Sequence, residues 1–300
     1  MKGQKDITAS IRQLLLNRAK SDLRPFNELL QYYAMERFLY RLSKSTYAKK
    51  FILKGALMLR VWQAAEYRST MDIDMLGKVS NDQQSIKHQI QQILTVEVNP
   101  DGLVFDAESI QTQQITEDAD YQGVRVRFKG SLGSARINMQ IDIGFGDIVY
   151  PKAERSELPT MLGNPAPRLL CYSRESAIAE KFEAMVKLGI LNSRMKDFYD
   201  IWMLARQFNF DGSLLAEAIN LTFKQRDTVL TEVIVAFQER FVIEKQVQWS
   251  AFCKRLTQEH VPIEFSEAVL LIQRFLYPIV NSSCAGKPFT SQWVAADKWY

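Results

Sequence analysis

The stretch that decides the fold is Ser69-Thr-Met-Asp-Ile-Asp-Met-Leu76, in which polar and apolar residues alternate. Such alternation is typical of a β-strand with one buried face, and it predicts a strand here. Because residues i and i+2 of a strand point to the same face, Asp72 and Asp74 should lie side by side. Two adjacent carboxylates repel unless a cation lies between them. Mg²⁺ (or Mn²⁺) suits such a site, although many surface strands carry two acids for no metal at all.

Two further elements strengthen the metal-site interpretation. Upstream, Lys54-Gly55-Ala56 ends a short apolar run and starts a helical segment, so its small residues leave N–H groups that phosphates can approach. Downstream, Ile141-Asp142-Ile143 places a third acid in an apolar strand. A buried strand rarely carries an isolated acid, because an unpaired buried charge is costly. Asp142 is therefore a candidate neighbour of the first two acids.

The rest of the chain changes character twice. Residues 5–45 are predicted to be helical, with an interruption at Pro25, and residues from 173 to about 280 are predicted to be helical as well. Between them, alternation and Gly/Pro punctuation predict strands with helical segments at 56–63 and 81–94, followed by a loop or domain boundary that extends to Pro167. We expect an α+β fold in two lobes, with a mixed sheet, N-terminal helices and a helical C-terminal domain. The predicted segments are 1–45, 46–165 and 166–300.

Composition excludes several classes of protein. The 300 residues contain 47% hydrophobic and 24% charged residues, which is ordinary for a globular chain and excludes a disordered one. No apolar run is long enough to cross a membrane, and no signal peptide is evident, so we expect a cytoplasmic protein without a membrane partner. Three widely spaced cysteines and two histidines argue against a disulfide framework, a histidine metal cluster and a Ser-His-Asp hydrolase. Any chemistry should depend on carboxylates and lysines.

The net charge of +4 hides a strong asymmetry. Residues 1–70 hold 14 Lys/Arg against 5 Asp/Glu, whereas residues 71–120 hold 2 against 10. A basic segment beside an acidic one fits a cation site next to a surface that attracts polyanions. The basic segment includes Lys44, Lys49 and Lys50, close in sequence to the Lys54-Gly55 turn. The alternatives are that the two segments pair with each other, or that their charges are simply solvated.

The order of these motifs resembles the DNA polymerase β-type nucleotidyltransferase superfamily. More closely, the chain resembles the AbiEii/AbiGii-type nucleotidyltransferase toxins, to which the MenT toxins look related. The matching motifs, within residues 25–210, are Lys54-Gly55-Ala56, Arg68-Ser-Thr-Met-Asp72-Ile-Asp74, Ala179-Glu180-Lys181 and Arg194-Met-Lys196-Asp197-Phe-Tyr199-Asp200. Two departures from the pattern are Ala56 in place of a second small glycine or serine and a longer gap from Gly55 to Asp72 than the superfamily usually shows.

The resemblance implies a nucleotidyltransferase core that transfers nucleotides from an NTP and releases pyrophosphate. It implies that Asp72 and Asp74 hold metal ions, with Asp142 as a third ligand or as an aid to deprotonating the acceptor. Lys181 and the Gly55–Ala56 backbone would bind the triphosphate, and Arg68 would bind phosphate or orient Asp72. The implied catalytic residues are Asp72, Asp74, Lys181 and Asp197, and the implied nucleotide-binding residues are Lys54, Gly55, Ala56, Arg68, Lys181, Arg194 and Lys196.

The Arg194–Asp200 motif also has a purely structural interpretation. On a helix, Arg194 and Asp197 are three residues apart, as are Asp197 and Asp200, while Lys196 and Asp200 are four apart. Such spacing produces a salt-bridge network that fixes the helix. The functional interpretation instead places Asp197 near the nucleotide, with Lys181 facing the triphosphate.

Three functions follow from these alternatives. The resemblance favours a toxin of a toxin–antitoxin or phage-defence system, which extends tRNA 3′ ends and blocks translation. Such toxins usually pair with an antitoxin, often a winged-helix regulator. A second hypothesis is a nucleotidyltransferase or kinase that modifies a protein or a small molecule such as an antibiotic, because fold does not decide function. The third is a catalytically silent nucleotide-binding module.

Overall fold

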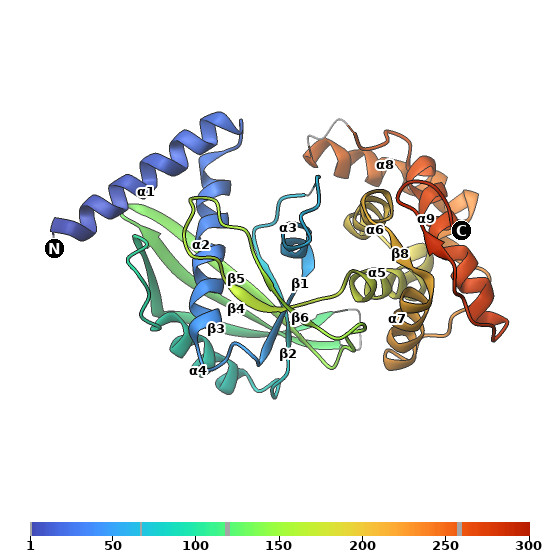
Figure 1. Cartoon of the computed structure of the whole chain (residues 1–300), viewed down its shortest axis with the longest axis horizontal. Coiled ribbons are helices and arrows are strands. Elements are labelled where there is room, and N and C mark those ends of the chain that lie inside the picture. The colour runs from blue at the N-terminus through green and yellow to red at the C-terminus, as the bar shows by residue number, and fades with distance from the viewer. Residues whose placement is uncertain (1, 67, 118–120, 257–259) are drawn as a thin grey trace. The chain divides into compact units, whose positions relative to one another are not determined.

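The computed structural model describes residues 2–66, 68–117, 121–256 and 260–300. The chain divides into two compact units, which are described separately. The first contains Met1–Gly146 and Glu154–Cys171, and the second contains Asp147–Ala153 and Tyr172–Tyr300 (Figure 1). The first unit thus combines the N-terminal helices with the strands.

A seven-stranded sheet organises the first unit. Its strands lie in the order β3-β4-β5-β2-β1-β7-β6. The pairs β2–β5 and β1–β7 are parallel, and the other neighbouring pairs are antiparallel, so the expectation of a mixed sheet is confirmed. The strands are β1 (Phe51–Lys54), β2 (Ile73–Gly77), β3 (Leu103–Glu117), β4 (Tyr121–Leu132), β5 (Ala135–Phe145), β6 (Glu154–Glu157) and β7 (Arg168–Cys171).

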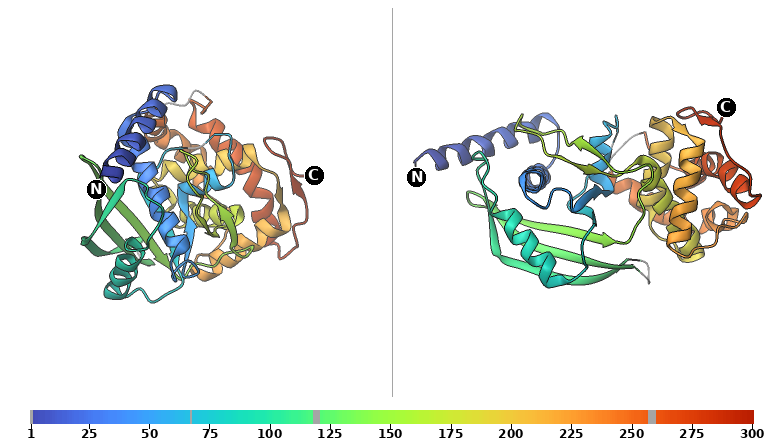
Figure 2. Two further views of the ribbon diagram at one scale, coloured as in Figure 1. Left: turned by 60° about the vertical axis from the view of Figure 1, so that its left-hand side comes forward. Right: turned by 60° about the horizontal axis from the view of Figure 1, so that its bottom comes forward.

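Helices α2 (Phe26–Lys44) and α4 (Gln83–Leu94) cover one face of the sheet. The ring of Phe38 on α2 lies 5.7 Å from that of Phe128 on β4, and the buried Ile86 and Ile90 belong to α4, which packs on β3. Figure 2 shows α4 lying across the outer strands of the sheet. Helix α1 (Lys2–Ser21) packs against α2, and a 3-10 turn (Gly55–Leu57) leads from β1 into the short helix α3 (Met58–Val61).

Helix α2 carries charged residues into the core of the first unit. Arg41 holds both carboxylate oxygens of Asp101, at 2.6 and 3.1 Å, and this pair is nearly inaccessible to solvent. Glu36 is fully buried and accepts a hydrogen bond of 2.9 Å from the backbone N–H of Met161. Burial raises the pKa of Glu36 to about 7, against the opposing effects of the Met161 hydrogen bond and of Arg37.

The second unit is built around helices, as the sequence predicts. A cluster of aromatic rings fills its core, including Phe198 stacked at 5.8 Å on Phe241 and in edge contact at 5.1 Å with Phe265. Ser173 caps α5 by accepting a hydrogen bond from the Ser176 N–H, which confirms the predicted helix start. The elements are α5 (Arg174–Leu188), α6 (Met195–Gln207), α7 (Gly212–Gln225), α8 (Glu239–Leu256), α9 (Phe265–Cys284), the pair β8 (Phe210–Asp211) and β9 (Gln292–Trp293), and 3-10 turns at Gly189–Leu191 and Val235–Phe237.

One prediction about local structure is wrong in part. The stretch from Gly144 to Pro167 is predicted to be a loop or a domain boundary, and the first segment of the first unit does end inside it, at Gly146. It is not all loop, however, because β6 forms inside it and pairs with β7. The sequence of β6, Glu-Arg-Ser-Glu, has no apolar alternation because this strand lies at the edge of the sheet and exposes most of its residues. Within the described ranges, no helix has both the length and the apolar character needed to cross a membrane.

Candidate functional site

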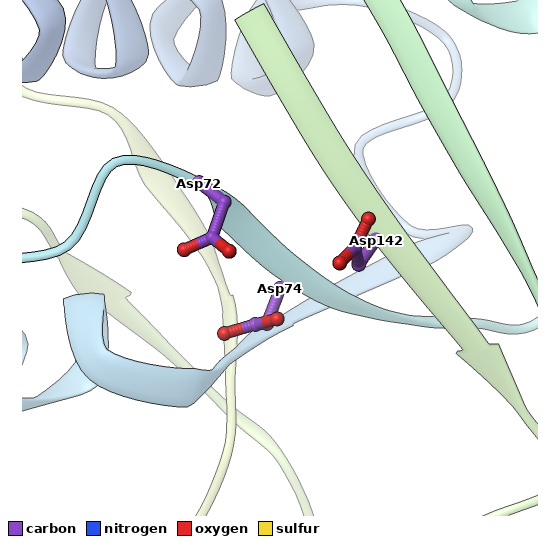
Figure 3. A group of neighbouring side chains, drawn as sticks. All are labelled: Asp72, Asp74 and Asp142. Atoms are coloured by element: carbon purple, nitrogen blue, oxygen red, sulfur yellow. The ribbon is translucent and has the colours of Figure 1, made fainter. Parts of the chain in front are cut away.

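Three aspartates meet where β2 and β5 run side by side. Asp74 on β2 is in register with Asp142 on β5, and Asp72 immediately precedes β2. One carboxylate oxygen from each residue lies within 4.8 Å of the others, and Figure 3 shows the three side chains grouped on the same side of these strands. The sheet therefore brings together the three acids that the sequence singled out. We call Asp72, Asp74 and Asp142 the acid cluster.

The acid cluster has the chemistry of a divalent-cation site. Asp142 is buried, and Asp72 and Asp74 are only partly exposed, so water screens their mutual repulsion incompletely. Carboxylate oxygens at this spacing match the ligands that Mg²⁺ and Mn²⁺ prefer. The three acids thus fit the metal that the sequence predicts.

Several neighbours of the acid cluster were missed by sequence reasoning. Gln140 on β5 donates its side-chain N–H to Asp142 Oδ2 at 3.3 Å. Arg125 on β4 donates to both oxygens of Asp142, from Nε at 2.8 Å and from a terminal nitrogen at 2.7 Å. Thr70 donates its hydroxyl to Asp72 Oδ1 at 2.5 Å. The alternation of Arg125 with Val124 and Val126 indicates that this side chain leaves the core. Only the β4–β5 register, however, places it opposite Asp142.

The Lys54-Gly55-Ala56 turn lies directly against the acid cluster. Lys54 is in register with Asp74, and Gly55 has a φ of +72°, which side chains disfavour. A Cβ atom on Gly55 would lie 2.0 Å from Asp74 Oδ2, so only glycine fits between this turn and the carboxylate. Ala56 is buried, which explains why a small residue follows. Arg68 is partly exposed in the irregular segment that leads to Asp72.

The remaining predicted site residues form a second cluster, within the helical unit. Lys181 Nζ on α5 lies 3.0 Å from Asp197 Oδ1 and 2.9 Å from Asp200 Oδ2 on α6. Arg194 Nε lies 2.6 Å from Asp197 Oδ2. Burial acts to raise the pKa of Asp197, but the charges of Lys181 and Arg194 outweigh it and hold that pKa below its ordinary value.

This second cluster is a salt-bridge network like the one that the helical spacing indicates, with one difference. Asp200 pairs with Lys181 across two helices, whereas the spacing suggested Lys196, which is exposed. No local pattern reports a contact between residues on different helices. Lys181 keeps 17% of its side chain exposed, so its ammonium group is not sealed in the core.

Comparison with known proteins supports one family. Residues 37–270 match the sequence profile of the nucleotidyl transferase AbiEii toxin of a type IV toxin–antitoxin system, and this range includes every candidate site residue. No curated protein sequence matches the chain.

A solved structure supports the same fold. A crystal structure described as "putative nucleotidyltransferase from H. pylori" aligns with a TM-score of 0.51 and 15% identity, over 85% of this chain and 96% of that one. The structure of JHP933 from Helicobacter pylori aligns with a TM-score of 0.49 and 13% identity, over 86% and 95% of the two chains. The fold is therefore the mixed α/β fold of nucleotidyltransferase-like proteins. The family profile matches more than three quarters of the length of this chain, and the chain therefore belongs to the AbiEii family of nucleotidyl transferase toxins.

Proposed function

We propose that this toxin transfers a nucleotide from an NTP to the 3′ end of tRNA, releases pyrophosphate, and thereby blocks translation. The acid cluster packed against the Gly55 turn is the observation that carries the proposal. It combines carboxylates suited to a divalent cation with a backbone turn suited to phosphates. Nucleotidyl transfer needs both, because its reacting centre is a charged phosphate.

The 3′ hydroxyl of the acceptor attacks the α-phosphorus and a new P–O bond forms. The bond from the α-phosphorus to the α–β bridging oxygen breaks, so pyrophosphate leaves, and the hydroxyl proton passes to Asp142 or to water. Mg²⁺ or Mn²⁺ ions, when bound, neutralise charge on the attacking and leaving oxygens. Asp72 and Asp74 would hold them, with Asp142 as the third ligand or as the group that helps to remove the hydroxyl proton. The chain otherwise contributes positioning and charge.

The cations and the turn have distinct proposed roles. The backbone at Gly55 and Ala56 would receive the triphosphate, close to Asp74, and Lys54 and Arg68 would add positive charge there. In the helical unit, Lys181, Arg194 and Lys196 are proposed to bind nucleotide phosphates. Asp197 contacts Lys181 and Arg194 directly, so its proposed contribution is to hold these two cations in place.

The family also implies a cognate antitoxin. We propose a winged-helix regulator as that antitoxin and the cytoplasm as the site of action. Phage defence is the biological role that a toxin of this kind would serve. The pairing is tested by measuring the growth of cells that express this chain alone and of cells that express it together with the product of an adjacent gene.

The test of the activity is direct. Purified protein is incubated with each labelled NTP, Mg²⁺ and total tRNA, and label on RNA is measured with and without a chelator. Asp74→Asn should abolish transfer, whereas Glu154→Gln, which removes an exposed acid on β6, should not change it. Replacing tRNA by protein or by an aminoglycoside tests the alternative acceptors. Absence of label on any acceptor, with all four NTPs, would contradict the proposed activity.

A further inference from the structure

The sheet has a polar face that begins at the acid cluster. Along β4, the inward residues Val124, Val126 and Phe128 are buried, whereas Arg127 and Lys129, which alternate with them, are exposed. Along β5, the residues Asn138 and Gln140 lie opposite these two cations and on the same face as Asp142. The helices α2 and α4 pack on the buried face. We call Arg127, Lys129, Asn138 and Gln140 the polar ladder.

Across β5, the two cations of the polar ladder face carboxamides and not acids. On the β3 side, Arg127 is in register with the neutral Gln111, whereas Lys129 is in register with Asp106. Moving away from the acid cluster, the cross-strand pairs are Arg125 with Asp142, Arg127 with Gln140, and Lys129 with Asn138. Arg125 is committed to Asp142 by its two hydrogen bonds. Arg127 instead donates to a neutral group, Gln140 Oε1, at 3.1 Å. A cation whose partner is a carboxamide keeps its charge available for a phosphate.

A hollow of about 500 Å³ joins the polar ladder to the acid cluster. Asp72 lines one part of it, and the four residues of the polar ladder line another. The lining also includes Glu108, Ser109 and Gln111 of β3. This volume lies within the range of small-molecule sites, so a nucleoside can enter it. Its lining combines cations, which suit phosphates, with carboxamides, which both donate to and accept from base and sugar groups.

We infer that the polar ladder binds the single-stranded 3′ end of a nucleic-acid acceptor and guides its terminal nucleoside toward Asp142. Arg127 and Lys129 would contact the acceptor's phosphates, and Asn138 would contact the terminal nucleoside. Gln140 accepts from Arg127 and donates to Asp142, so it would meet the nucleoside with its remaining donor and acceptor capacity. This inference rests on the proposed nucleotidyl transfer, because it assigns the acceptor side of the same site.

The strand order separates the acceptor from the NTP. The sheet runs β4-β5-β2-β1, so the acid cluster has the Gly55 turn on its β1 side and the polar ladder on its β4 side. If the triphosphate lies at the Gly55 turn, the attacking hydroxyl must come from the opposite side of the α-phosphorus. The polar ladder supplies two exposed cations on that side, Arg127 and Lys129.

An extended, single-stranded nucleic acid suits the polar ladder better than a nucleic-acid duplex does. Arg127 and Lys129 are two residues apart on one strand, which is roughly 7 Å, and the two face the same way. Such a narrow row can follow one phosphate backbone, whereas a duplex presents two backbones and hides its base edges. Binding of this type depends on charge and is not expected to depend strongly on sequence.

The test measures binding without NTP, so it is independent of turnover. The probe is a fluorescent single-stranded RNA of about 12 nucleotides, and its Kd is measured over a range of salt concentrations. Arg127→Gln/Lys129→Gln should weaken binding by about 10-fold or more and make the plot of log Kd against log salt shallower by about 1.4, which is 0.7 per lost phosphate contact. The control Arg155→Gln/Arg168→Gln removes two exposed cations from β6 and β7 and should bind like wild type.

The possible outcomes separate this inference from the proposed function. Unchanged Kd and salt slope in the Arg127/Lys129 variant would overturn the inference, as would equal losses in the control variant. Equal affinity for a blunt RNA duplex would also overturn it. Transfer to a protein or small molecule, with no RNA binding, would overturn the inference and leave a nucleotidyltransferase. RNA binding that depends on Arg127 and Lys129, without transfer from any NTP, would support the inference and contradict the proposed activity.

Discussion

Gly55 lies so close to Asp74 that a Cβ atom at position 55 would be 2.0 Å from Asp74 Oδ2. Because glycine has no side chain, the backbone of the turn packs directly against the Asp74 carboxylate. A shift of either group moves the other. This contact couples the proposed phosphate-binding turn to the proposed metal ligand.

Gly55→Ala should consequently reduce transfer activity strongly and the stability of the fold only modestly. The methyl group must displace the Asp74 side chain, and misplacement of a reacting group by about 1 Å costs on the order of 100-fold in rate. Left-handed backbone at a non-glycine residue costs about 1–2 kcal/mol of stability. Transfer assays and thermal unfolding measure the two effects separately.

Gly163→Ala is the matched control for this change. Gly163 has the same φ of +72°, but an added Cβ would meet no atom within 4 Å. It should show the loss of stability without the loss of transfer. Wild-type transfer by Gly55→Ala would show that contact with Asp74 is not required.

Arg125→Gln should increase the thermal stabilisation that divalent cations give to the protein. Arg125 now neutralises Asp142 with two short hydrogen bonds, so its removal leaves three carboxylates with less compensation. We expect a loss of about 1–3 kcal/mol in unfolding free energy without metal, and a larger rise in Tm on addition of Mn²⁺ than wild type shows. Arg155→Gln, which changes an exposed cation on β6, serves as the control. A Mn²⁺-induced rise no larger than that of wild type would contradict the explanation.

The acid cluster could be predicted from the sequence because each of its residues lies in a short segment whose own pattern indicates a strand. Alternation assigns Asp72 and Asp74 to one face of a strand, and the apolar neighbours of Asp142 place it in another strand of the core. Their convergence needs only that these two strands be neighbours, which the β2–β5 pairing confirms. The functional roles of the three acids stay predictions.

The partners of these acids could not be predicted in the same way. Arg125 meets Asp142 through a cross-strand register, and Lys181 meets Asp200 through the packing of two helices. Both contacts depend on how segments far apart in the sequence are placed, and periodicity carries no information about that placement. The strand β6 was missed for a related reason, since pairing with β7 and not its own apolar pattern holds it in the sheet.

The ion pairs of Asp197 predict a loss of stability in acid. Burial acts to raise the pKa of Asp197, but Lys181 and Arg194 lower it below the ordinary value of 3.8. A group with a lowered pKa contributes its full stability above the unfolded-state value and loses that contribution as the pH falls below it. Asp197→Asn should therefore lower Tm at about pH 6 and flatten the decline of Tm toward about pH 3. Glu217→Gln, an exposed acid on α7, should keep the wild-type profile.

Glu36 predicts the opposite pH dependence in the first unit. Burial raises its pKa from 4.5 to about 7, so the folded state holds a proton that the unfolded state releases between these values. Stability then falls as the pH rises through this window, by up to about 3 kcal/mol at 1.4 kcal/mol per pKa unit. Glu36→Gln keeps an oxygen for the Met161 N–H and cannot ionise. It should unfold at a higher temperature than wild type at about pH 8 and at nearly the same temperature at about pH 5. If the difference in Tm between the two proteins is the same at both pH values, Glu36 does not titrate in this range.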